Sequence, residues 1–207
     1  MRVSGWRPAG IALGAIAVAA VFLSAIAAPP RPNAAPGAGI VLVVDPAQSK
    51  VHYTVDSTLH TVHGTFNVKN GTLTFDPVSG KANGEVVVYA TSGDSGNSSR
   101  DEKMHKEILE TKTYPEATFR PTQVEGAVGL SGASDVKVRG IINVHGQDHE
   151  IVSVVHAEVA ADRWKGNAKF DVPYIQWGIK DPSNWLLKVK PVVNVELDMA
   201  GTVKASN

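Results

Sequence analysis

The 207-residue chain contains no cysteine, which excludes disulfides, thiolate metal sites, cysteine catalysis and a lipidated N-terminal cysteine. It also has no excess of one charge, because 20 basic side chains balance 20 acidic ones. Nucleic acids and acidic membranes favour proteins with surplus Lys and Arg, so the composition indicates neither partner. The hydrophobic share of 43% is enough for one domain with its own core.

The N-terminus has the features of an export segment. Two arginines precede an uncharged apolar run over residues 11–28, and Ala25-Ile26-Ala27 supplies a small-x-small cleavage pattern. Residues 1–28 are therefore predicted to be a signal peptide, with an uncleaved membrane anchor as the alternative. Residues 29–39, rich in Pro, Ala and Gly, are predicted to be a linker before a single domain at 40–207. Both alternatives place that domain outside the cytoplasmic membrane, in the periplasm or another extracytoplasmic space.

Most of the remaining chain alternates between apolar and polar residues with a period of two. Val51, Tyr53 and Val55 alternate with polar neighbours, and residues 193–199 repeat the pattern. Asn70-Gly71 predicts a hairpin turn, because both residues tolerate positive φ. About eight to ten short strands are expected, which suits an antiparallel sandwich or a closed barrel.

A single helix is predicted from Ser99 to about Lys112. Ser99 and Glu102 form a capping box, and Met104, Ile108 and Leu109 give an apolar stripe at helical spacing. One helix among strands argues against a parallel α/β sheet. We expect it to cover the end of a barrel, whose interior holds either packed side chains or one small ligand.

Two catalytic alternatives come from the residues around this helix. Residues 93–96 read Gly-Asp-Ser-Gly, as around the nucleophile of trypsin-like proteases. A Ser95 nucleophile needs a positioned histidine and carboxylate, and an asparagine follows where that motif has glycine. A loop leading into the helix is the simpler interpretation. Arg100, Asp101 and His105 form the second candidate group, which a first helical turn explains without catalysis.

Histidine spacing does not indicate a metal site. His60 and His63 are three residues apart, which on a strand points them to opposite faces. His145 and His149 flank a tight turn, an arrangement weaker than two histidines on one helical face. We therefore predict no bound metal.

Aromatic residues gather in one unusual segment. Residues 172–187 carry Trp177 and Trp185 beside glycine and two prolines. Such a segment either packs on the core or lines the entrance to a ligand site.

Four sequence blocks together resemble the YceI-like domain, also called the polyisoprenoid-binding domain. The blocks are residues 60–66, 71–77, 99–119 with their Arg-Asp and Tyr-Pro pairs, and 138–146 with Val-x-Gly and His-Gly. The resemblance covers nearly all of residues 45–203. One difference is that many members follow Arg-Asp with His-Leu and paired phenylalanines, whereas this chain has a shifted histidine and Ile108-Leu109.

The resemblance implies a lipocalin-like antiparallel β-barrel with one short helix and an internal apolar pocket. It further implies an exported lipid-binding protein, not an enzyme, that holds a polyisoprenoid, an isoprenoid quinone or a similar long lipid without a cofactor. An envelope interaction module with a filled barrel is the alternative. The residues expected to contact the ligand are Phe66, Val88, Met104, His105, Ile108, Leu109, Phe119, Trp177 and Trp185.

Overall fold

The computed structural model describes residues 39–129 and 131–205, so the predicted signal segment lies outside the described residues. Within the described residues, no helix is both long enough and apolar enough to cross a bilayer. The helical elements are η1 (Pro46–Gln48), α1 (Ser98–Lys103) and η2 (Met104–Ile108). The strands are β1 (Ile40–Val44), β2 (Lys50–Asp56), β3 (Thr61–Phe75), β4 (Ala82–Asp94), β5 (Glu116–Glu125), β6 (Gly132–Val144), β7 (Gln147–Ala160), β8 (Arg163–Val172) and β9 (Val193–Ala205).

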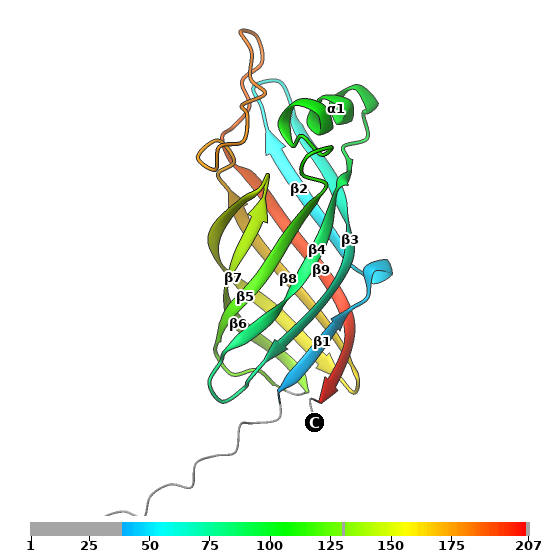
Figure 1. Cartoon of the computed structure of the whole chain (residues 1–207), viewed down its shortest axis with the longest axis vertical. Helices are drawn as coiled ribbons and strands as arrows, with labels where there is room; N and C mark the ends of the chain where they lie inside the picture. Colours follow the sequence, from blue (N-terminus) through cyan, green and yellow to red (C-terminus); the bar gives the residue numbers. More distant parts are fainter. Residues whose placement is uncertain (1–38, 130, 206–207) are drawn as a thin grey trace, which may run out of the picture. The chain divides into compact units, whose positions relative to one another are not determined.

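The nine described strands form one closed antiparallel ring (Figure 1). From β3 to β9, each strand pairs with the next along the chain. Both β1 and β2 pair with β3 on one side and β9 on the other, so together they occupy one position in an eight-position barrel. Ring closure confirms the predicted antiparallel barrel with one short helical segment and excludes an open sandwich.

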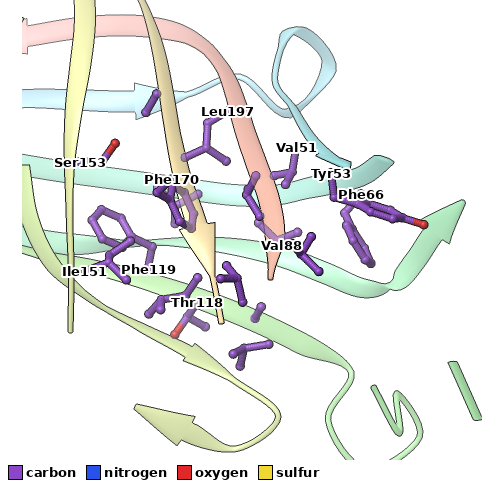
Figure 2. A pocket seen from close by; sticks show the side chains of 18 of the residues that line it. Val51, Tyr53, Phe66, Val88, Thr118, Phe119, Ile151, Ser153, Phe170 and Leu197 are labelled. Carbon is purple, nitrogen blue, oxygen red and sulfur yellow. The ribbon is translucent and has the colours of Figure 1, made fainter. Parts of the chain in front are cut away.

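Along the strands, side chains that point into the barrel alternate with side chains that point outward. In β8, buried and exposed residues alternate from Arg163 to Lys169, as expected when one face of a sheet is closed off from water. Figure 2 shows side chains from several strands, among them Val51, Phe170 and Leu197, pointing into the same interior space. The period-two pattern of the sequence therefore marks the inward face.

One predicted turn is wrong. β3 continues through Asn70-Gly71, and its pairing with β4 instead shifts register between Val68 and Asn70. A Cβ on Gly71 would lie 2.8 Å from Val44 Cγ2, so this glycine lets neighbouring strands approach closely. The chain reverses later, at residues 76–81, where the Asp76 carboxylate accepts the backbone N–H of Val78 (2.8 Å).

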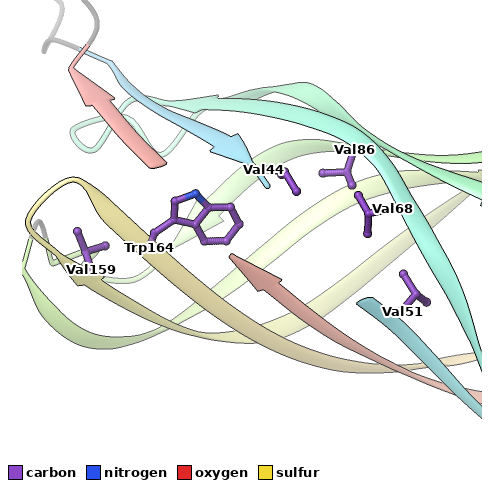
Figure 3. Packing of buried hydrophobic residues seen from close by; sticks show 6 residues of the cluster. All are labelled: Val44, Val51, Val68, Val86, Val159 and Trp164. Carbon is purple, nitrogen blue, oxygen red and sulfur yellow. The ribbon is translucent and has the colours of Figure 1, made fainter. Parts of the chain in front are cut away.

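A cluster of buried side chains fills part of the barrel interior. Val44, Val68, Val86 and Val159 belong to this cluster with Trp164, at the level where β1 ends (Figure 3). Elsewhere along the barrel the interior is less tightly filled. Among the described residues, no large side chain has less than 2% of its surface exposed, which is typical of a hollow barrel.

The helical segment begins one residue earlier and ends about four residues sooner than predicted. The Asn97 side chain, not Ser99, caps α1 by accepting the N–H of Arg100 (3.0 Å). The helix widens into the π-helical turn η2, which ends at Ile108 with Leu109 as its C-cap. It does not continue, because Glu110 adopts a left-handed φ of 46°.

Candidate functional site

The barrel encloses an apolar cavity of about 720 Å³. Small-molecule sites in proteins occupy about 300–1,000 Å³, so this volume suits a ligand rather than a packing defect. Every strand contributes inward side chains to the lining. The cavity removes the basis for the filled-barrel alternative.

Aromatic and branched aliphatic side chains form the middle of the cavity wall (Figure 2). Phe66 packs on Tyr53 with ring centroids 5.3 Å apart, and Phe119 of β5 points into the same interior. Because these groups offer almost no hydrogen bonds, the wall favours a hydrocarbon over a polar solute.

Residues 98–109, which we call the lid segment, add the apolar stripe predicted from the sequence. Met104, Ile108 and Leu109 all line the cavity. The hydroxyl of Tyr53 donates to the thioether sulfur of Met104 (3.6 Å), and burial raises the pKa of Tyr53 to about 12. The lid segment is thus joined to the barrel wall at the cavity itself.

The strands add single polar residues to the lining, Thr74, Thr118, Ser153 and Asn167, and a further polar group lies at the end of the cavity nearest the lid segment. His60, Asn97, Arg100 and Lys103 all contribute there. The Nη1 atom of Arg100 lies 3.4 Å from Nε2 of His60. A long apolar wall with a small cationic and amide-bearing end suits an amphiphile whose headgroup lies beside the lid segment.

Ser95 connects the loop after β4 to the lid segment. Its backbone N–H donates to the Asp101 carboxylate (2.9 Å), and its hydroxyl donates to the same oxygen. The Nε atom of Arg100 donates to the Ser95 hydroxyl oxygen (2.8 Å). Among the described residues, no histidine is hydrogen-bonded to Ser95, so the base of a hydrolytic triad is not assembled there.

Seven of the nine predicted ligand-contacting residues line the cavity, and their contact with a ligand stays a prediction. These seven are Phe66, Val88, Met104, Ile108, Leu109, Phe119 and Trp177. His105 lies outside the lining, because its Nε2 atom turns to the carbonyl oxygen of Gly93 at 3.0 Å. Trp185 is also outside it, with 87% of its surface exposed at a loop tip.

The prediction missed lining residues whose signal was already in the strand pattern. Tyr53, Ile151, Phe170 and Leu197 line the cavity from four strands. Each follows from the phase of the alternation once the barrel is known to be hollow.

The histidines flanking the β6–β7 turn have separate partners. His145 Nε2 lies 2.8 Å from a carboxylate oxygen of Glu110, whereas the His149 ring stacks on Trp177 with centroids 4.2 Å apart. Within the described ranges, no group of three or more His, Cys, Asp or Glu side chains is placed to hold a metal ion.

Comparison with known proteins places the barrel in a family context. The model of the YceI-like domain matches residues 42–200. A UPF0312 protein of Vibrio cholerae is 27% identical over 179 residues, which cover 84% of this chain and 92% of the relative. Protein YceI of Escherichia coli is 33% identical over 89 residues, covering 41% of this chain and 43% of the relative.

Two solved structures share the fold. BcnA of Burkholderia cenocepacia aligns with a TM-score of 0.63 and 18% identity, over 77% of this chain and 99% of BcnA. A polyisoprenoid-binding domain from Saccharophagus degradans aligns with a TM-score of 0.57 and 16% identity, over 79% of this chain and 98% of that domain. At these identities the likeness concerns the fold.

Proposed function

Since the chain belongs to the YceI-like domain family, we propose that it binds a long apolar lipid, such as a polyisoprenoid or an isoprenoid quinone, inside its barrel. The Saccharophagus degradans neighbour, described as a polyisoprenoid-binding domain, supports this ligand class. The role proposed is sequestration or transport of the lipid.

The observation that carries the proposal is the continuous apolar lining of the 720 Å³ cavity. Each methylene moved from water into such a space contributes about 0.8 kcal/mol, so a long tail supplies most of the binding free energy. The headgroup would lie at the polar end, near Arg100 and Lys103. That arrangement needs no bond-making chemistry from the protein.

Native mass spectrometry of the protein purified without detergent tests the proposal. We expect bound mass that extracts into organic solvent and is a long-chain isoprenoid or related lipid. After delipidation, adding a polyisoprenoid or quinone should change tryptophan fluorescence, because Trp164 and Trp177 both line the cavity. A protein that is always empty, with fluorescence insensitive to both lipids, would contradict the proposal.

A binding role without catalysis is also part of the proposal. The Ser95 hydroxyl is hydrogen-bonded to Asp101 and Arg100, and the residue is buried. A serine-directed fluorophosphonate should therefore not label it. Labelling of the native chain that disappears in Ser95→Ala would restore the hydrolase alternative.

Export of the domain is proposed from the sequence of residues 1–28, with its two arginines and apolar run. N-terminal sequencing of the protein from fractionated cells checks this, and we expect an extracytoplasmic protein that starts near Ala28. A full-length chain in the membrane fraction would support the anchor instead, and one in the cytoplasm would contradict export.

A further inference from the structure

Three large apolar side chains stand exposed at the end of the barrel where the lid segment lies. Leu59 is 65% exposed, Trp185 is 87% exposed and Leu186 is 61% exposed. We call these three residues the apolar tip. Single exposed hydrophobic residues are common, but a tryptophan and two leucines on adjoining loops are typical of an interaction site.

Hydrogen bonds hold the Trp185 turn in shape. The Asn184 side chain accepts the N–H groups of Leu186 (2.9 Å) and Leu187 (2.8 Å). Within that turn Leu187 lines the cavity, whereas Trp185 and Leu186 face outward. The turn itself therefore directs the side chains of Trp185 and Leu186 outward.

The loop that carries Leu59 is hydrogen-bonded to the loop that carries Trp185 and Leu186. The N–H of Thr58, next to Leu59, donates to the carbonyl oxygen of Lys188 (2.9 Å), and Ser57 forms a β-bridge with Val189. Ser57 and Val189 also line the cavity. The apolar tip is thus continuous with the cavity wall, at the uppermost loops in Figure 1.

We propose that the apolar tip inserts into the surface of a lipid bilayer and so places this end of the cavity against the membrane. Tryptophan and leucine at a protruding loop suit the boundary between headgroups and acyl chains. Lys188 lies exposed in the same loop, whereas Lys190 is paired with Asp56 (2.8 Å). The Lys188 side chain is therefore the positive charge beside the apolar tip. The ammonium group of Lys188 complements lipid phosphates while the apolar residues enter the bilayer.

A membrane is favoured over a protein partner because of the cargo. A long isoprenoid has little solubility in water, so it enters and leaves most easily where apolar surface is continuous between cavity and bilayer. Docking goes beyond lipid binding, although the choice of a membrane as the partner rests on the proposed function. An always-empty protein that still docks would contradict the proposed function alone, and a lipid-loaded protein that does not dock would contradict the docking alone.

Two vesicle measurements on the full-length chain test the docking. The first uses vesicles of brominated phosphatidylcholine and phosphatidylglycerol, in which bromine quenches nearby tryptophan. We expect a quenched fluorescence component that is absent in Trp185→Phe. Equal quenching of the two proteins would overturn the proposal.

The second measurement is cosedimentation with unbrominated vesicles of the same two lipids. The combined variant Leu59→Ser, Trp185→Ser and Leu186→Ser should lower the vesicle partition coefficient by at least about tenfold, because three apolar side chains no longer insert. The matched control, Val78→Ser, Val152→Ser and Val154→Ser, removes three exposed hydrophobic residues elsewhere and should partition as the unaltered chain does. Residues 1–38 are identical in all three proteins, so their contribution cancels. An equal loss in both variants, or in neither, would overturn the proposal.

Discussion

Gly201 is the residue where the close approach of strands is most demanding. It lies in β9 opposite Val44 of β1 and Trp164 of β8. A Cβ at this position would overlap the carbonyl oxygen of Val43, which accepts the indole N–H of Trp164 at 3.4 Å. The absence of a side chain at Gly201 therefore allows Trp164, an aromatic residue of the buried cluster, to reach its hydrogen-bond partner.

We expect Gly201→Ala to lower the free energy of unfolding by about 1–3 kcal/mol or more, because the backbone must move to relieve the overlap. Urea unfolding followed by circular dichroism measures the change. The matched control is Gly166→Ala, whose Cβ would meet the Trp164 ring at 3.2 Å and should cost less. Equal losses for the two variants would show that the overlap at Val43 is relieved easily.

Two buried tyrosines make stability depend on alkaline pH. Burial raises the pKa of Tyr53 from 10 to about 12, and burial with a smaller contribution from Asp181 raises that of Tyr174 to about 12. Because the unfolded chain loses these protons first, their contribution is complete below pH 10 and is lost as pH rises toward 12. Each tyrosine should lower the free energy of unfolding by up to about 1.4 kcal/mol per pH unit in that window.

Tyr53→Phe should reduce this alkaline loss, and urea midpoints between pH 9 and pH 12 measure it. Tyr89→Phe is the control, because the Tyr89 side chain lies outside the cavity lining and is 40% exposed. A Tyr53→Phe protein as sensitive to alkali as the unaltered chain would contradict the assignment.

At the scale of elements, the lid segment is held by a few polar contacts rather than by a long helix. α1 spans only Ser98–Lys103, too short to be stable without its surroundings. Asp101 accepts both the N–H and the hydroxyl of Ser95, and Met104 packs inward beside Tyr53. We therefore expect the lid segment to open more easily than the paired strands of the cavity wall.

Asp101→Ala should loosen the lid segment, because Ser95 then loses its acceptor. We expect faster amide hydrogen exchange across residues 95–109 and lipid release that is faster by about tenfold, in line with one or two lost charged hydrogen bonds. Glu102→Ala is the neighbouring control, because its side chain is 74% exposed. If exchange and release are the same in both variants, the Asp101 contacts do not hold the lid segment.

At the scale of the molecule, a substitution in the hollow interior is expected to change ligand binding without lowering the stability of the fold. Ala168 of β8 faces the cavity, whereas the next residue, Lys169, has a side chain that is 73% exposed on the outside. A large side chain at position 168 fills ligand space, whereas one at position 169 lies on the outside, where Lys169 is paired with Glu196 (2.8 Å).

Ala168→Trp should weaken binding of an added polyisoprenoid by at least about tenfold, since the indole occupies volume that the tail needs. The melting temperature should hold or rise, because apolar surface is buried in a pre-existing cavity. Lys169→Trp adds the same side chain outside and should bind as the unaltered protein does. Titrations monitored by native mass spectrometry compare the three, and unweakened binding by Ala168→Trp would place the ligand elsewhere.

The sequence by itself determined the strand periodicity, the apolar stripe of the lid segment and the order of blocks that identifies the family. These features are local, or depend on residue order alone. The period of two assigns Val51, Tyr53 and Leu197 to one face whatever that face packs against. The same alternation fits a packed sandwich or a hollow barrel equally well, so it left the cavity undecided.

Only the tertiary structure decided the features that depend on contacts between distant segments. Asn70-Gly71 favours a turn locally, but the close approach of Val44 to Gly71 makes it part of a continuous strand. Trp185 is a large aromatic residue of the kind that lines ligand pockets. The turn held by the Asn184 side chain nevertheless directs it to solvent. Closure of the ring, through pairing of β9 with β1 and β2, turns an apolar sheet face into an enclosed cavity. No local pattern encodes that closure, because its partners are separated by most of the length of the domain.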